Sequence, residues 1–116
     1  MARRYSVVVW WATPVEVRSA FARLSRMNAL DSAGLQLAEA ALAVLRKQWR
    51  EIAPDENVRD HGGTMLSRFP LRAADALQLA AAMVWAMGRP TERAFISGDA
   101  QLLNAATQLG FEAIEA

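Results

Sequence analysis

Cysteine is absent from this sequence of 116 residues, and histidine occurs once, at His61. The lack of cysteine excludes a disulfide scaffold, a zinc ribbon and a thiol nucleophile. A single histidine beside Gly62 and Gly63 has none of the context of a Ser-His-Asp triad, and the glycine pair matches no phosphate-binding loop. We therefore interpret His61 as a loop residue.

Long apolar runs are missing as well. The apolar stretch 7–12 is too short for the core of a signal peptide, and no run approaches the ~20 residues of a membrane span. We therefore expect a cytoplasmic protein with no membrane contact. The length and the 53% hydrophobic content are typical of one globular domain, which we place at residues 1–116.

An excess of charge of one sign is also lacking. The 13 basic and 12 acidic side chains leave a net charge of +1, which creates no general attraction to nucleic acid. Of the basic residues only Lys47 is a lysine. Arginine favours bidentate phosphate contacts, but a coding bias explains the same excess, so composition does not reveal a function.

The first half of the chain predicts a strand followed by two helices. Residues 6–12 are β-branched and aromatic, as in a strand buried on both faces. The sequence TPVE at 13–16 predicts a capping box with proline at the first helical position. The helix that it opens is expected to end near residues 28–30.

The second helix of this pair is predicted to be the longer one. Asp31 or Ser32 would cap it, and an apolar stripe continues to Ile52, before Pro54 stops the helix. We expect the two helices to form a hairpin.

The second half predicts further helices and strands in alternation. Residues 56–60 suggest a short edge strand, and 61–64 suggest a turn into a short helix that ends at Pro70. The remaining predictions are a nearly all-buried helix at 71–86, a strand at 93–97, a helix at 100–109 and a strand at 111–114.

This alternation favours an α/β fold with a small parallel sheet covered by helices on both faces. Only two or three strands are convincing, so the sequence looks as though it begins in the middle of a fold. The four tryptophans could stack on nucleobases, but we expect at least three of them in the core. Trp49 and Trp85 fall on apolar helix faces, and Trp10 or Trp11 on the buried strand.

Asp75 is the most informative acidic residue, because after Arg72 the helix predicted around it has only one other polar residue, Gln78. A carboxylate in such a place would cost several kcal/mol unless it is paired, hydrogen-bonded or bound to a metal. The alternative to a functional role is a buried ion pair with Arg72 or with another arginine.

Asp99 and Glu16 each follow a predicted strand and open a helix. Asp99 is a natural N-cap, and Glu16 fits the third helical position of a capping box, so each has a purely structural explanation. Asp75, Asp99 and Glu16 are nevertheless expected at one rim of the sheet. Carboxylate clusters suit Mg²⁺ or Mn²⁺, which can activate water for attack on a phosphodiester.

Three blocks of the sequence together resemble the PIN-domain family, in particular the toxin ribonucleases of VapC type. They are VVVWWATPVEVRSAFARL, FPLRAADALQLAAAM and AFISGDAQLLNAATQLGFEAI, and the resemblance covers essentially the whole chain. It implies a three-layer α/β/α sandwich and Mg²⁺- or Mn²⁺-dependent cleavage of RNA. It also implies neutralisation by a small antitoxin protein, and homodimers.

The resemblance assigns Glu16, Asp75 and Asp99 as catalytic metal ligands and Ser97 as a weaker candidate. Thr13 and Arg72 are two further weak candidates beside these residues. The family's sheet opens with a central strand that ends in an aspartate, and no acidic residue precedes Glu16 here. We therefore expect an N-terminally shortened PIN-like fold or a true start upstream of Met1.

Three functions remain open at this point. The leading one is a toxin endoribonuclease with a metal-activated water, and the second is a catalytically silent PIN-like module that binds antitoxin or RNA. The third is a helical interaction domain without metal, in which Asp75 pairs with an arginine. A sheet without its central strand would also favour pairing of two chains into a homodimer.

Overall fold

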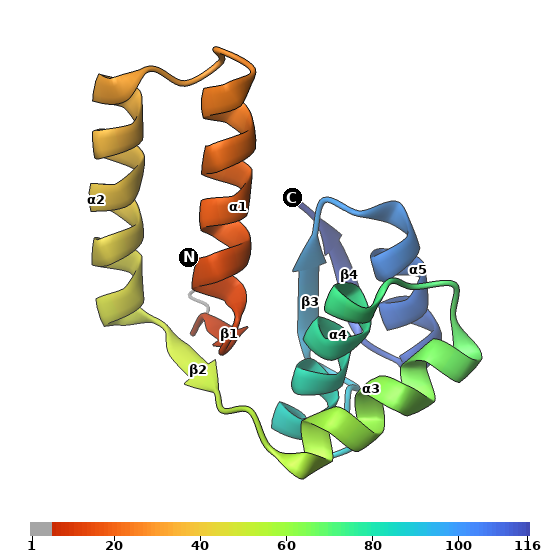
Figure 1. Ribbon diagram of the computed structural model, residues 1–116. Helices are drawn as coiled ribbons and strands as arrows, with labels where there is room; N and C mark the ends of the chain where they lie inside the picture. The colour runs from red at the N-terminus through yellow and green to blue at the C-terminus, as the bar shows by residue number, and fades with distance from the viewer. Residues whose placement is uncertain (1–5) are drawn as a thin grey trace. The chain divides into compact units, whose positions relative to one another are not determined.

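The chain divides into two units, Met1–Ile52 and Ala53–Ala116, and each contains one small parallel sheet. The computed structural model describes residues 6–116; the basic opening stretch, residues 1–5, lies outside them. Five helices and four strands occur in this described part, and Figure 1 shows their order along the chain. The predicted α/β class with parallel strand pairing is therefore confirmed. The sequence predicts one sheet, whereas the described residues form two sheets of two strands each.

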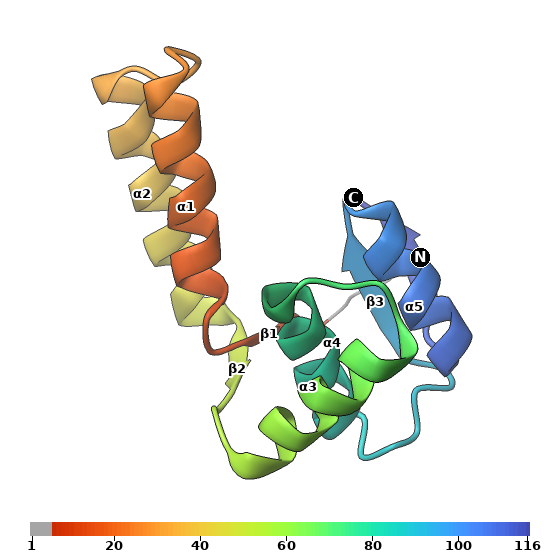
Figure 2. The same ribbon diagram turned by 45° about the vertical axis from the view of Figure 1, so that its right-hand side comes forward.

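The first unit consists of a helical hairpin between two short strands. Strand β1 (Val8–Trp10) leads into α1 (Thr13–Arg26) and α2 (Ser32–Gln48), which run antiparallel in Figures 1 and 2, and β2 (Arg50–Ile52) follows. The two strands pair in parallel, with Val8 opposite Arg50. An ion pair between Arg18 of α1 and Glu39 of α2, with an N–O distance of 3.0 Å, links the helices.

The helix starts of this unit follow two different patterns. Asp31 caps α2, because its side chain accepts a hydrogen bond of 2.7 Å from the backbone N–H of Gly34. The capping box predicted at Thr13 is wrong: α1 begins one residue earlier than that motif requires, so Ala12 is the N-cap and no side chain caps the helix. The Ala12 carbonyl accepts hydrogen bonds from Val15 and Glu16.

The predicted helix through Ile52 is also wrong at its end. The backbone becomes extended at Trp49, and the N–H of Arg50 donates to the carbonyl of Val7. Residues 50–52 therefore satisfy their backbone groups by pairing with β1, and this pairing overrides the apolar periodicity that continues along the sequence.

The second unit begins with two helices and ends with a βαβ arrangement. Its elements are α3 (Glu56–Arg68), α4 (Ala73–Trp85), β3 (Ala94–Ser97), α5 (Ala100–Leu109) and β4 (Glu112–Glu115). Strands β3 and β4 pair in parallel, with Ala94 opposite Glu112. The last three predicted elements are confirmed to within two residues at each end. Gly110 closes α5 with a φ of 109°, a left-handed conformation that favours glycine.

The edge strand and turn predicted at 56–64 are wrong, since this segment belongs to α3. Asp55 caps the helix by accepting a hydrogen bond of 3.0 Å from the N–H of Val58. Val58, Gly62 and Met65 are buried on one side of it. Their spacing of three and four residues is a helical periodicity, which the glycine pair obscures in the sequence.

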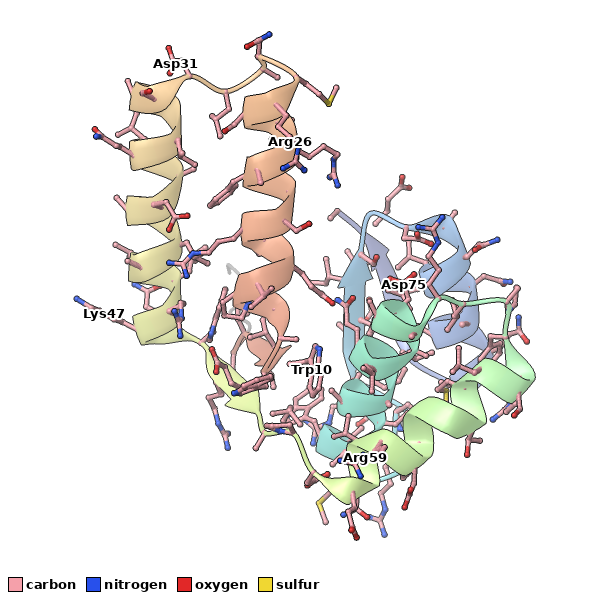
Figure 3. The ribbon with its side chains drawn as sticks, in the orientation of Figure 1. Trp10, Arg26, Asp31, Lys47, Arg59 and Asp75 are labelled. Atoms are coloured by element: carbon pink, nitrogen blue, oxygen red, sulfur yellow. The ribbon has the colours of Figure 1, made fainter. Side chains whose placement is uncertain are left out.

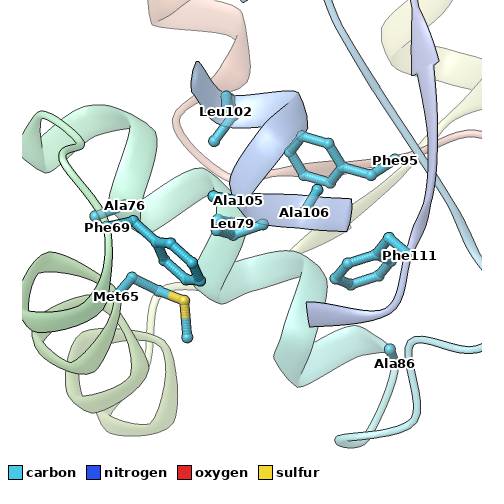
Figure 4. Packing of buried hydrophobic residues seen from close by; sticks show 10 residues of the cluster. All are labelled: Met65, Phe69, Ala76, Leu79, Ala86, Phe95, Leu102, Ala105, Ala106 and Phe111. Atoms are coloured by element: carbon cyan, nitrogen blue, oxygen red, sulfur yellow. The ribbon is translucent and has the colours of Figure 1, made fainter. Parts of the chain in front are cut away.

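The hydrophobic core lies in the second unit. Ten buried residues from α3, α4, β3, α5 and the segments that directly follow the helices pack together, and Figure 4 shows them. Leu79 is fully buried, and Phe95 and Phe111 have ring centroids 5.8 Å apart. In the first unit only Trp10, Pro14 and Leu42 are buried among the described residues, so its own packing is much thinner. No helix in the described part of the chain has the length and apolar character needed to cross a bilayer.

Candidate functional site

Asp75 lies in the first turn of α4 and is half-buried. Among residues 6–116 no polar or charged residue is fully buried, which corrects the prediction of a buried Asp75. Its carboxylate also has no hydrogen-bond or ion-pair partner within this described range, so the expected pair with Arg72 is absent. Asp75 needs no partner because it lies in the first turn of the helix, which is open to solvent and favours negative charge.

Arg72 is the N-cap residue of α4 and is exposed. Its side chain makes no capping hydrogen bond. Arg72 therefore lies three residues before Asp75 in the sequence without forming an ion pair with it.

Asp99 occupies the position between β3 and α5. It is the N-cap of α5, and its Oδ1 accepts a hydrogen bond of 3.0 Å from the backbone N–H of Leu102. The residue is exposed, and one carboxylate oxygen suffices for the cap. The structural explanation of Asp99 is thus confirmed, and it leaves the second oxygen available to a ligand.

Ser97, the last residue of β3, supports this turn. Its hydroxyl oxygen accepts a hydrogen bond of 3.0 Å from the backbone N–H of Asp99. The bond fixes the backbone from which the Asp99 side chain extends. Ser97 therefore helps to fix the position of Asp99.

The second unit gathers these residues at one end. The first turn of α4, where Figure 3 labels Asp75, lies toward the end at which β3 and β4 finish. Asp99 follows the carboxyl end of β3 directly. The carboxyl ends of parallel strands are the usual ligand-binding edge of α/β sheets.

Glu16 and Thr13 belong to the first unit. Glu16 lies in the first turn of α1, Thr13 is the first residue of that helix, and both are half-buried. The structure therefore brings Asp75, Asp99, Ser97 and Arg72 to one end of the second unit. It places Glu16 and Thr13 at the start of a helix in the other unit.

The donor set of the second unit has the chemistry that a hard divalent cation requires. Two carboxylates and a hydroxyl supply oxygen ligands, as Mg²⁺ and Mn²⁺ prefer. Within residues 6–116, however, no group of three or more acidic, histidine or cysteine side chains is arranged to hold a metal ion. The residues fit part of a metal site rather than a complete all-protein cage.

A pocket in the first unit was not predicted from the sequence. It has a volume of about 310 Å³ and is lined by Ser6, Val7, Leu45, Gln48, Trp49 and Arg50. The periodicity of α2 assigns Trp49 to the core, but the ring is half-buried at the end of that helix. Trp10 alone of the four tryptophans is buried, and Trp11 is 57% exposed, so the expectation of three core tryptophans is wrong.

No family model, curated protein or solved structure matches this chain.

Proposed function

We propose that this chain is a metal-dependent endoribonuclease of PIN-like type, the toxin component of a VapBC-type toxin–antitoxin pair. The observation that carries the proposal is the placement of Asp75 and Asp99 toward the strand-end edge of the second unit. Asp75 comes from a helix start and has no partner among the described residues, and Asp99 follows β3. A carboxylate without a protein partner keeps its oxygens available to a cation.

Asp75 and Asp99 are the residues that would hold Mg²⁺ or Mn²⁺. When bound, such a cation lowers the pKa of water and stabilises charge on a phosphodiester. In this proposal Ser97 positions Asp99 through its backbone N–H, and the free Asp99 oxygen faces the ligand while the other keeps the helix capped. Glu16 is a candidate ligand on the resemblance of the sequence alone.

The proposed function includes a proposed fold, the three-layer α/β/α sandwich of PIN-like proteins. Parallel strands joined through helices, as in β3–α5–β4, are the building unit of an α/β/α sandwich. This supports a PIN-like three-layer architecture. RNA as substrate, a small antitoxin as partner and a homodimer belong to the proposal on the resemblance of the sequence.

The second candidate function is a catalytically silent module of the same type that binds antitoxin or RNA. The donors that the second unit itself supplies favour it: they are the carboxylates of Asp75 and Asp99, with the Ser97 hydroxyl beside them. A site with only two carboxylates would hold a cation weakly.

Cleavage of RNA by the chain in Mn²⁺, with EDTA and Asp75→Asn as controls, separates these candidates. Metal-dependent cleavage that both controls abolish would establish the nuclease. A folded chain that binds RNA but never cleaves it would establish the silent module. Cleavage that persists in Asp75→Asn would contradict the proposed site.

The proposed homodimer has a separate test. Sedimentation at tens of micromolar, the order at which weak dimers form, should show a species of twice the chain mass. A monomer at that concentration would contradict this part of the proposal without affecting the site.

A further inference from the structure

We propose that the pocket where α2 passes into β2 binds one nucleotide of a single-stranded RNA. The base would stack on the Trp49 indole, and the Arg50 guanidinium would contact the adjacent phosphate. This inference rests on the RNA substrate proposed above, but it concerns the first unit and residues that take no part in metal binding.

The size and lining of the pocket suit a nucleotide. Its volume of about 310 Å³ lies at the lower limit of small-ligand sites, roughly 300–1,000 Å³. Val7, Leu45 and Trp49 give it apolar walls, and Ser6, Gln48 and Arg50 add polar groups. An aromatic ring, a few hydrogen-bonding groups and one cation match the base, the polar edges and the phosphate of a nucleotide.

The Trp49 ring is held in place before any ligand arrives. Its Nε1–H donates a hydrogen bond of 3.0 Å to Oε2 of Glu51, two residues further along the chain. This bond occupies the polar edge of the indole and restrains its rotation, while the half-buried ring remains partly accessible. Pre-ordering an aromatic side chain reduces the entropy lost when a base stacks on it.

Arg50 supplies the charge complementarity. It is exposed, and within residues 6–116 its guanidinium has no hydrogen-bond or ion-pair partner. The planar guanidinium forms paired hydrogen bonds with phosphate oxygens. Arg46 and Lys47 lie in the last turn of α2 just before the pocket, so the backbone of an RNA strand would meet further positive charge there.

Fluorescence anisotropy of a short labelled oligoadenylate, titrated with the full chain in EDTA, tests the site without any need for turnover. We expect Arg50→Ala to lower the affinity about tenfold, on the scale of a charge-assisted phosphate contact. The matched control is Lys47→Ala, which removes the same charge three residues away and does not line the pocket. Its loss should be about threefold or less, as expected for a general electrostatic contribution.

A tryptophan series tests the stacking. Trp49→Leu should lower the affinity about tenfold or more, and Trp49→Phe should keep most of it, because phenylalanine retains a ring face. Circular dichroism verifies folding. If Trp49→Leu does not fold, the comparison of Trp49→Phe with the Arg50 and Lys47 variants still decides the question.

Several outcomes would overturn this inference. They are absence of oligoadenylate binding at micromolar protein, equal losses in Arg50→Ala and Lys47→Ala, and binding of free AMP as tight as that of the oligonucleotide. The last result would identify a free nucleotide as the ligand. The nuclease proposal can fail without this one. If the chain never cleaves RNA but its RNA binding depends on Trp49 and Arg50, the nuclease proposal is wrong and the nucleotide site is supported.

Discussion

The backbone N–H of Asp99 donates a hydrogen bond of 3.0 Å to the hydroxyl oxygen of Ser97. The Asp99 carboxylate, in turn, caps α5 by accepting from the N–H of Leu102. The same side chain therefore has a structural task on one oxygen and a proposed ligand role on the other. Substitutions can separate the two.

Asp99→Asn should leave stability within a few tenths of a kcal/mol, because asparagine caps helices as well as aspartate. Asp99→Ala should cost about 1 kcal/mol, since α5 loses its cap. Both variants should abolish metal-dependent cleavage. Urea unfolding and an RNA cleavage assay measure the two effects. If Asp99→Asn cleaves like the unaltered chain, the residue is only a cap.

Asp75→Asn should lower cleavage by at least about a hundredfold, given that even outer-shell changes cost 10–100-fold in metal sites. Its stability should barely change, because the Asp75 carboxylate has no partner among residues 6–116. The matched control is Asp60→Asn, an exposed carboxylate of the same unit on α3. Equal activity in the two variants would remove Asp75 from the site.

Arg72→Met should change the free energy of unfolding by no more than about 0.5 kcal/mol, as for other exposed side chains without partners. Arg72 is exposed and makes neither a capping bond nor an ion pair with any described residue. Thermal or urea unfolding measures the change. A loss above about 1 kcal/mol would revive the third hypothesis from the sequence, in which Asp75 is neutralised by an arginine.

The helices and strands with clear local signals are those that the sequence predicts well. Asp31 before α2, Asp99 before α5 and Gly110 after α5 mark helix ends that the structure confirms. The predictions are wrong where pairing with a segment far away in the sequence determines the secondary structure. Residues 50–52 continue an apolar helical pattern, yet they pair with β1, which lies some forty residues earlier in the chain.

The candidate site could be predicted only in part for a related reason. The sequence predicts a strand followed directly by a helix, and this order places Asp99 at the end of the strand. The sequence does not reveal that Asp75 is only half-buried, because a carboxylate in an apolar segment is expected to be buried until the start of the helix is known. The Trp49 pocket depends on where α2 stops, which periodicity alone misplaces by four residues.

The pair Gly62 and Gly63, which made α3 hard to predict from the sequence, gives a further prediction. Gly62 and Gly63 both lie inside this helix, where alanine is favoured over glycine by about 1 kcal/mol. A Cβ on Gly63 would meet nothing within 4 Å, so Gly63→Ala should raise the free energy of unfolding by most of that amount.

Gly62→Ala should gain clearly less, because its Cβ would lie 3.2 Å from Cδ2 of Leu77 on α4. That distance is shorter than an ordinary contact, so the Leu77 side chain must shift, and the strain offsets the helix propensity. Urea unfolding of the two variants under the same conditions measures the difference directly. Equal gains would show that α3 and α4 do not approach as closely at Gly62 as these contacts require, and a loss in Gly63→Ala would contradict a helix through the pair.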